Sequence, residues 1–269
     1  MSAPLDVWED RPVEKWRDDW GIPALEIHPS LGSTNDRALA LAAAGAAGLT
    51  TVIADEQTAG RGRGGRLWAS PAGLGLWLSV ILRLDQGAAS PLLSVALGAV
   101  VARMLESVAA PAAPGLKWPN DVLLGGKKVC GILCEIGDGA QVVIAGIGLN
   151  ILQRQEHFAP EIRETATSIL LATGKPVPRS ALAGELLRGI QRWLVPLPRR
   201  LERQLAREVA RFDVLRVRKV RTSTGVSGWA VGIAADGALV VLDQEGLRRR
   251  VLGGSVELAS APLGREEIA

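Results

Sequence analysis

Residues 57–68 most restrict how this chain folds, because glycine and arginine alternate there directly after an apolar run. The segment reads Gln57-Thr-Ala-Gly-Arg-Gly-Arg-Gly-Gly-Arg-Leu-Trp68, with four glycines and three arginines at positions 60–66. Glycine lets backbone N–H groups crowd around a guest, and the arginine fork pairs with phosphate or carboxylate oxygens. The segment predicts an anion-binding loop after a strand at 51–56. A solvated basic surface loop is the alternative interpretation.

A second polar segment, Lys117-Trp-Pro-Asn-Asp121, follows a short apolar strand. Trp118 and Pro119 restrict the backbone there, so the Lys117 ammonium can be held as a fixed point charge. Asn and Asp favour a turn after the strand. The segment indicates a cation at a site, and a surface turn around a packed Trp118 is the alternative.

A third segment, Ser33-Thr-Asn-Asp36, opens the Ala/Leu-rich run 37–44. It predicts a helix capped by Ser33 or Thr34, with Asp36 in the first turn. A helix N-terminus also binds the polar head of a ligand, so a structural and a binding role are compatible.

In their order and spacing, five segments resemble the motifs of the biotin protein ligase family. They are Ser33-Thr34-Asn35, Gln57-Thr-Ala-Gly-Arg-Gly-Arg63, Lys117-Trp-Pro-Asn-Asp121, Gly126-Lys-Lys-Val-Cys-Gly-Ile-Leu-Cys-Glu135 and Gly146-Ile-Gly-Leu-Asn150. The resemblance implies an enzyme that forms biotinoyl-5'-AMP from biotin and ATP. It also implies that biotin then passes to one lysine of the biotin carboxyl carrier domain of a carboxylase. Biotin, ATP and Mg²⁺ are the expected ligands.

The resemblance also implies a fold. We expect an α+β protein whose mixed sheet and flanking helices are related to class II aminoacyl-tRNA synthetases, followed by a small SH3-like β-barrel. The expected organisation is a weakly patterned leader at 1–27, a catalytic biotin- and ATP-binding domain at 28–212 and the SH3-like domain at 213–269.

Site residues follow from the resemblance, position by position. The expected biotin-binding set is Ser33, Thr34, Asn35, Gln57, Gly60, Arg61, Gly62, Arg63, Lys117 and Gly131. The expected nucleotide-binding set is Arg63, Arg66, Trp68, Lys117, Asn120 and Asn150. The expected catalytic residues are Lys117, Arg61 and Arg63, and no protein metal ligand is expected. Trp68 offers a stacking face for adenine, with ordinary packing as its alternative.

The expected chemistry explains this concentration of positive charge. A carboxylate must attack the α-phosphate of ATP, so two anions have to meet in a partly dry site. The arginines of the loop and Lys117 would supply the opposing charge, with Mg²⁺ on the triphosphate. No enzyme nucleophile is required, which agrees with the two histidines, His28 and His157, lying beside no Ser or Cys motif.

Hydrophobic periodicity predicts the other elements. Strands are expected at 75–84, 116–118, 122–124, 129–135 and 141–149, and short strands at 214–220, 226–233, 238–242 and 248–252. One helix should open at Ser90-Pro91 and bury Leu93, Leu97, Val100, Met104 and Val108. A second should be capped by Ser180, and a charged helix should follow within 199–211.

Composition and chain length limit the expected location and partners of the protein. The net charge of +3 suits anionic ligands, and neither a secretory signal nor a membrane-spanning run is present, so a cytoplasmic protein is expected. Cys130 and Cys134 should pack on one strand face as small hydrophobes. Only 32 residues precede Ser33, against the roughly sixty of a winged helix-turn-helix, so no sequence-specific DNA binding is expected. A homodimer through a sheet edge is compatible with the sequence.

Two alternative functions remain. A lipoate- or octanoate-type protein ligase or transferase also acts on a carrier lysine, but its pocket must accept a long apolar chain rather than a polar ring. A non-catalytic nucleotide- or nucleic-acid-binding module would use the Arg/Gly loop and the basic residues 216–221. The first strand of that region lacks the aromatic residues that stack on bases, which disfavours it.

Overall fold

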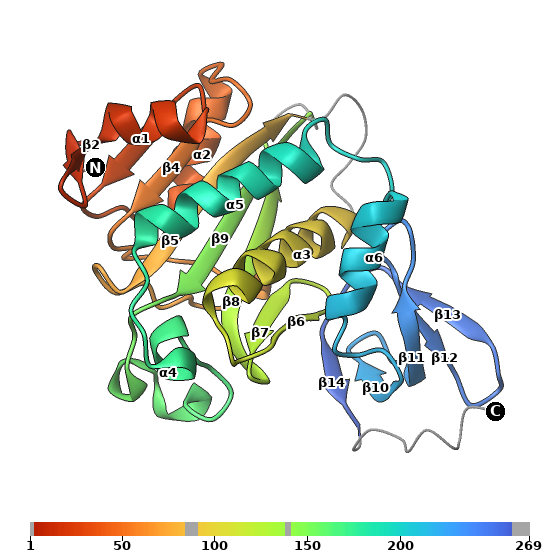
Figure 1. The fold of residues 1–269 in the computed structure, drawn as a ribbon. Helices are drawn as coiled ribbons and strands as arrows, with labels where there is room; N and C mark the ends of the chain where they lie inside the picture. Colours follow the sequence, from red (N-terminus) through yellow and green to blue (C-terminus); the bar gives the residue numbers. More distant parts are fainter. Residues whose placement is uncertain (1–2, 84–90, 138–140, 260–269) are drawn as a thin grey trace.

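Two β-sheets organise the computed structural model, which describes residues 3–83, 91–137 and 141–259 (Figure 1). The strands of the large sheet are β3 (Leu25–His28), β4 (Thr51–Ala54), β5 (Gly75–Arg83), β6 (Pro114–Lys117), β7 (Asp121–Leu124), β8 (Lys127–Ile136) and β9 (Val142–Asn150). Their order in the sheet is β3-β4-β5-β9-β8-β7-β6. Only β3 and β4 pair in parallel within it, so the expected mixed sheet is confirmed.

Helices cover both faces of the large sheet. Helices α3 (Pro91–Val108) and α5 (Arg179–Leu194) pack on one face within the main apolar core. Helix α2 (Thr34–Ala43) covers part of the other face through a smaller cluster that includes Val142 and Ile144 of β9. Helices therefore bury both faces of the sheet. The part of the second face beyond the N-terminus of α2 is not covered by a helix of the described residues, and the site lies there.

Helix α3 follows the predicted apolar stripe. Leu93, Leu97, Val100 and Met104 are buried, and Val108 is partly buried. Ser90, the expected opening residue, lies outside the described residues. The helix is long and apolar enough to cross a membrane by length and composition, but two-thirds of that window is buried inside the protein (67%), as in the core helix of a globular domain.

The expectation of a weakly patterned leader at 1–27 is wrong for its described residues, because they form strands and a helix that join the core. Strands β1 (Val7–Trp8) and β2 (Arg11–Pro12) form a hairpin, helix α1 (Val13–Trp20) follows, and β3 joins the large sheet. Trp8, Trp16 and Trp20 pack together, with ring centroids 5.6 to 6.5 Å apart. Trp8 and Trp20 are each only 3% exposed, so this segment belongs to the main core.

An ion-pair network joins this hairpin to the rest of the molecule. Arg179 donates from Nε to Glu9 Oε1 at 3.1 Å and from Nη1 to Asp55 Oδ1 at 2.6 Å. Trp8 Nε1 also donates to Asp55 Oδ1, at 3.1 Å. Glu9 accepts the backbone N–H of Ser180, so α5 begins at Arg179 with a carboxylate from another segment at its N-terminus, and the predicted Ser180 cap is wrong.

The remaining helices are short or lie between the two sheets. Short α4 (Ile169–Thr173) and the 3-10 turns η2 (Gln155–His157) and η3 (Pro160–Ile162) follow β9, and η1 (Arg63–Gly65) lies in the Arg/Gly loop. Helix α6 (Arg203–Phe212) lies between the large sheet and the C-terminal sheet and overlaps the charged region 199–211 that was expected to be helical.

The C-terminal sheet is antiparallel, in the order β13-β12-β11-β10-β14. Its strands are β10 (Arg218–Thr222), β11 (Ser227–Ile233), β12 (Leu239–Leu242), β13 (Arg248–Val251) and β14 (Val256–Leu258). The predicted strand at 214–220 is displaced, because Val214 N–H donates to Leu116 O and ties that segment to β6. β14 was not predicted. The α+β class with a small β domain is confirmed.

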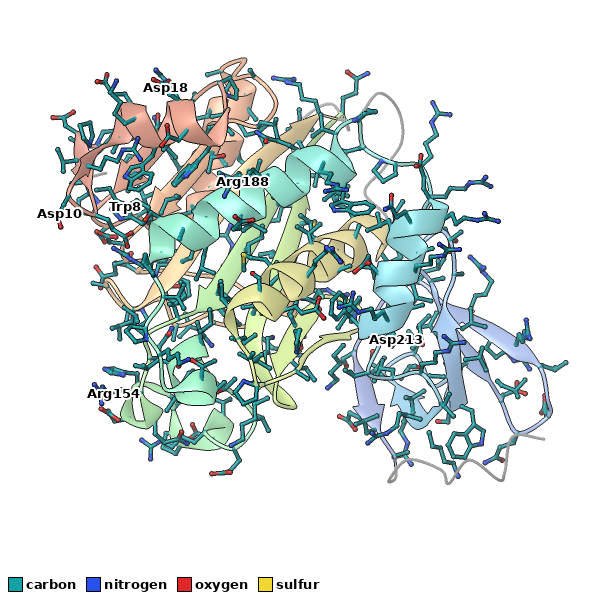
Figure 2. The ribbon with its side chains drawn as sticks, viewed as in Figure 1. Trp8, Asp10, Asp18, Arg154, Arg188 and Asp213 are labelled. Atoms are coloured by element: carbon teal, nitrogen blue, oxygen red, sulfur yellow. The ribbon has the colours of Figure 1, made fainter. Side chains whose placement is uncertain are left out.

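Asp213 lies at the junction of the two sheets (Figure 2). Burial raises the pKa of its carboxyl to about 6, although the backbone N–H groups of Leu215 and Arg216 act in the opposite direction. Trp118 Nε1 donates to Gly237 O at 2.8 Å across the same junction. The C-terminal sheet is thus held against the strand that carries Lys117.

We predict that Arg179→Ala lowers the free energy of unfolding by about 3 kcal/mol, because it leaves the Glu9 and Asp55 carboxylates half-buried without their counterion. Urea denaturation measures the change. Arg188→Ala is the matched control on the same helix (Figure 2), since Arg188 makes an exposed pair with Glu185 and should change stability by less than about 0.5 kcal/mol. Equal effects of the two substitutions would contradict the prediction.

Candidate active site

A cavity of about 1200 Å³ lies over β8 and β9, beyond the N-terminus of α2. The residues predicted for the site that line it are Ser33, Thr34, Asn35, Gln57, Arg61, Gly62, Arg63, Arg66, Trp68, Lys117, Asn120, Gly131 and Asn150. Gly60 alone among the predicted residues does not. A Cβ there would lie 2.5 Å from Trp68 O, so Gly60 serves close packing behind the loop.

The floor of the cavity is made of glycine. On β9, Val142 and Ile144 pack against α2, and the next residues on the same face are Gly146, Gly148 and Asn150. A Cβ at Gly146 would lie 2.3 Å from Asn35 Oδ1, and one at Gly148 would lie 2.4 Å from Trp68 Nε1. A Cβ at Gly131 of β8 would also meet the Trp68 ring, at 2.9 Å. The Trp68 ring thus lies directly on backbone.

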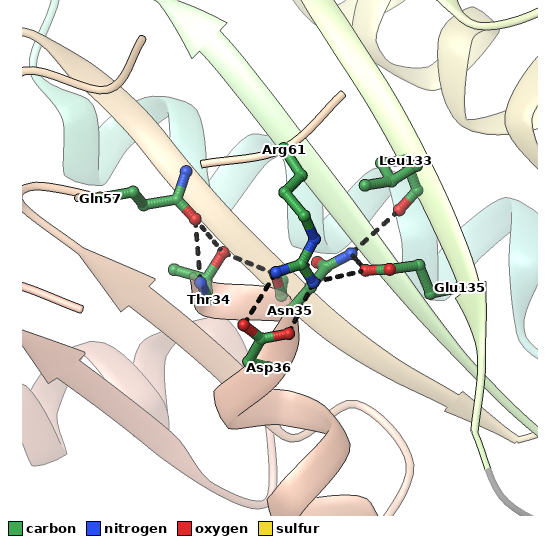
Figure 3. Close-up of polar contacts among 8 residues, drawn as sticks. Thr34, Asn35, Asp36, Gln57, Arg61, Leu133 and Glu135 are labelled. Atoms are coloured by element: carbon green, nitrogen blue, oxygen red, sulfur yellow. Dashed lines mark hydrogen bonds and ion pairs between the residues drawn. The ribbon is translucent and has the colours of Figure 1, made fainter. Parts of the chain in front are cut away.

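One end of the cavity is a hydrogen-bonding cluster (Figure 3). Gln57 Oε1 accepts from Thr34 N at 2.9 Å and from Thr34 Oγ1 at 3.0 Å, and Gln57 Nε2 donates to Ser70 Oγ at 2.8 Å. Ser79 Oγ lies 2.7 Å from Thr34 Oγ1 and donates to Asn35 Oδ1 at 2.5 Å. Ser33 precedes α2 with extended backbone but forms no side-chain cap, so its hydroxyl is not committed to the helix.

Arg61 is enclosed by carboxylates (Figure 3). It donates to both carboxylate oxygens of Asp36, at 2.9 and 2.5 Å, and lies 3.5 Å from Glu135 Oε2. Asn35 Nδ2 donates to the same Glu135 oxygen at 2.5 Å. The Arg61 hydrogen bond raises the pKa of the guanidinium and lowers that of Asp36. The side chain of Arg61 thus fastens the loop to α2 and β8.

Arg63 and Lys117 are paired differently. Arg63 Nη1 donates to two neutral oxygens, Asn120 Oδ1 at 3.3 Å and Gly254 O at 3.2 Å, the latter in the loop before β14. Asn120 is itself oriented by donating to Ile132 O at 2.8 Å. Lys117 is half-buried, and its ammonium group makes no hydrogen bond or ion pair with another residue in the described ranges. The charge of these two cations is therefore not neutralised within the described part of the site. Arg66 is exposed at the rim.

Several residues of the site were missed from the sequence. Lys128 lines the cavity, with Nζ 2.7 Å from Asp121 Oδ1 and 5.2 Å from the centre of the Trp68 ring. Lys128 and Glu135 stood within the motif at 126–135, but nothing in the sequence showed which of its residues face the cavity. Ser70, Ser79 and Gly254 lie outside the quoted motifs.

The other end of the cavity is formed by Asn150 and Gln153, neither of which is more than 5% exposed. Asn150 Nδ2 donates to Thr167 O at 3.1 Å, and Gln153 Nε2 donates to Asn150 Oδ1 at 3.0 Å. Phe158 and Ile162 add apolar surface beside them. Polar groups thus lie at both ends, with the cations and Trp68 between.

The described residues contain no group of three His, Cys, Asp or Glu side chains able to hold a metal ion. Cys130 is buried and Cys134 partly buried on the same face of β8. Burial raises the pKa of Cys134 to about 11 and raises that of Cys130 further, so both thiols stay protonated at neutral pH. They pack as small side chains.

Comparisons with known proteins match both parts of the chain. The Biotin/lipoate A/B protein ligase family matches residues 29–151, and the Biotin protein ligase C terminal domain matches residues 219–259. The bifunctional ligase/repressor BirA of Bacillus subtilis is 34% identical over 247 residues, which are 87% of this chain and 74% of that protein. The biotin–[acetyl-CoA-carboxylase] ligase of Mycobacterium tuberculosis is 37% identical over 250 residues, 90% of this chain and 88% of that protein.

Among solved structures, the biotin protein ligase of Aquifex aeolicus in complex with biotin and ATP is similar throughout. The TM-score is 0.75 at 28% sequence identity, covering 89% of this chain and 100% of that one. The two bacterial relatives named above match over 74% and 88% of their own length, and the two family matches occur in order along the chain. The chain therefore belongs to the biotin protein ligase family and is a biotin ligase.

Proposed function

We propose that this enzyme condenses biotin with ATP to biotinoyl-5'-AMP and transfers biotin to a specific lysine of a biotin carboxyl carrier domain. The observation that carries the proposal is one continuous cavity in which a hydrogen-bonding end adjoins two cations, Arg63 and Lys117, that have no carboxylate partner among the described residues. Such cations attract the two acids that must react. Relatives named biotin–[acetyl-CoA-carboxylase] ligase support the same acceptor class.

In this proposal the ring of biotin lies at the end formed by Ser33, Thr34, Asn35 and Gln57. Hydroxyl and amide groups there donate and accept hydrogen bonds, as a ureido ring requires. Gly62 leaves room for close approach of the backbone to the ligand, whereas Gly60 and Gly131 allow Trp68 to pack closely beside the site. An apolar lipoyl or octanoyl chain offers these hydroxyl and amide groups no hydrogen bond beyond those they already make with one another, and this disfavours the lipoate-type alternative.

The cations have different tasks in this scheme. Arg63 and Lys117 would hold the biotin carboxylate against the α-phosphate, and Lys128 would exchange Asp121 for a phosphoryl oxygen as negative charge develops. The side chain of Arg61 would position the loop, because Asp36 already occupies its fork. Arg66, Trp68, Asn120 and Asn150 would contact the nucleotide, with the Trp68 ring as a stacking surface. The partner's lysine amine then attacks the mixed anhydride.

Mg²⁺ fits this scheme as an ion carried by ATP. Among the described residues that line the cavity, Asp121 is paired with Lys128 and no three-carboxylate group is present. Mg²⁺ commonly keeps several waters and binds substrate phosphates rather than an all-protein cage. When bound, the ion neutralises the triphosphate, while Arg63 and Lys117 orient the reacting carboxylate.

The expectations on DNA binding, oligomeric state and cellular location remain predictions. Sequence-specific DNA binding is not expected, and a homodimer and a cytoplasmic location are compatible with the fold. The basic residues Lys219 and Arg221 of β10 are exposed, but a non-catalytic nucleic-acid-binding role leaves the cavity without a use.

The proposed reaction is tested by incubating the enzyme with ATP, Mg²⁺ and either biotin or lipoate, and by detecting the acyl-adenylate by mass. We expect biotinoyl-adenylate and no more than trace lipoyl-adenylate. Addition of a carrier domain should then consume the adenylate and add biotin to one lysine. Equal adenylate from both acids, or none from either, would contradict the proposal.

We predict that Lys117→Ala and Lys128→Ala each slow adenylate formation at least about 100-fold, because each removes a cation from a site where charge develops. Lys127→Ala is the control, since Lys127 precedes Lys128 but does not itself line the cavity, and its ion pair with Glu164 is exposed to solvent. Its rate should stay within about twofold of the parent. Near-parental turnover in the Lys117 variant would remove that residue from the catalytic set, and the same holds separately for Lys128.

We predict that Arg63→Ala releases biotinoyl-adenylate into solution, because charged hydrogen bonds of about 1.5–3 kcal/mol each are lost from the loop. The sign is biotin on lysines of a bystander protein such as albumin. Arg248→Ala, in exposed β13, is the control and should label bystanders no more than the parent. Retention of the intermediate by the Arg63 variant would show that this guanidinium does not hold it.

A further inference from the structure

A short relay of side-chain amides ends in an unpaired oxygen at the wall of the cavity. Thr167 O accepts from Asn150 Nδ2, and Asn150 Oδ1 accepts from Gln153 Nε2. Gln153 Oε1 is then left buried without a hydrogen-bond partner, in a residue only 2% exposed that lines the cavity. A buried acceptor without a donor is rare in folded proteins and points to a missing partner.

The direction of this relay is fixed by the backbone. Because the Thr167 carbonyl can only accept, Asn150 must turn its NH₂ group toward it and its oxygen toward Gln153. Gln153 must in turn present its NH₂ group to Asn150. The free end of the relay is therefore a carbonyl oxygen, and turning either amide over would leave two like groups facing each other.

The position of the relay on β9 tells which part of a ligand it meets. Gly146 lies at Asn35, Gly148 lies under Trp68, and Asn150 ends the strand on the same face. Four residues of strand span about 13 Å. A ligand whose polar ring lies at Asn35 and whose reacting carboxylate lies near Arg63 thus reaches Asn150 and Gln153 with its far end. In the proposed function on which this inference rests, that end is the base of the nucleotide.

Access to the oxygen requires only a modest movement. The wall beside Gln153 continues into η2 and η3, and most residues from 154 to 165 are exposed, with Phe158 as the buried one. A shift of this segment breaks few core contacts. Apolar surface from Phe158 and Ile162 also suits the faces of a purine.

We propose that Gln153 Oε1 accepts a hydrogen bond from the exocyclic amine of the base, so that Gln153 selects a 6-aminopurine nucleotide. A purine that carries hydrogen at position 6 leaves Gln153 Oε1 unpaired. A 6-oxo purine places its own carbonyl oxygen against Gln153 Oε1, so two acceptors face each other. The selection comes from the residue at the end of the amide relay, with Asn150 and the Thr167 carbonyl as its orienting groups.

The test compares ATP with purine riboside triphosphate, which lacks only the exocyclic amine, in biotinoyl-adenylate formation at saturating biotin. In the parent, KM for the analogue should exceed KM for ATP by at least about tenfold. In Gln153→Met, which keeps the side-chain length and removes the acceptor, KM for ATP should rise and the ratio of the two values should fall to about one. Gln155→Met is the control, since exposed Gln155 donates to Arg163 O outside the cavity lining and should keep the parental ratio.

Each result decides the inference separately from the proposed function. A parent that makes no biotinoyl-adenylate with ATP contradicts the function itself. A parent that makes it equally well from both nucleotides contradicts the role of Gln153, and so does a Gln153→Met variant that keeps the parental ratio. Because the comparison in the parent needs no substitution, the inference stays testable even if the variant does not fold.

Discussion

The site depends on the absence of side chains at three positions of the sheet. At Gly131, Gly146 and Gly148 any Cβ would lie within 3 Å of Asn35 or Trp68. The N-terminus of α2 and the end of the Arg/Gly loop can therefore rest on the backbone of β8 and β9. This approach lets Asn35 reach Glu135 and brings Arg61 to the same carboxylate, so the loop and the helix meet over one surface.

Charge is distributed unevenly over that surface. Arg61 forms ion pairs with Asp36 and Glu135, which attach this end of the loop to α2 and β8. Arg63, only two residues along, meets an amide and a backbone carbonyl instead, so its charge remains available to an anion. Two arginines of one loop thus have different partners, carboxylates for Arg61 and neutral oxygens for Arg63, which the alternation of Gly and Arg in the sequence does not reveal.

Local patterns made much of the fold predictable. Apolar alternation located the strands around the loop, and helical spacing located the buried stripe of α3, because both signals are carried by adjacent residues. The N-terminal segment escaped prediction because Trp16 and Trp20 form an apolar face only when Trp8 of a separate hairpin closes it. The sequence alone could not show that Lys128 rather than Lys127 faces the cavity, because that depends on the register of β8. The unpaired oxygen of Gln153 was also unpredictable, because Thr167, in a different turn, sets the orientation of Asn150 and therefore of Gln153. These features depend on contacts between residues far apart in the sequence, which local motifs do not show.

The contact between Arg63 and Gly254 joins the loop over the cavity to the C-terminal sheet. The small β domain therefore contributes part of the wall of the cavity, through Ser223 and residues 254–258. The mixed anhydride of the proposed reaction must be kept from water until transfer. Separating the domains would remove this wall of the cavity, so hydrolysis of the anhydride would compete with transfer even where every group that makes it remained in place.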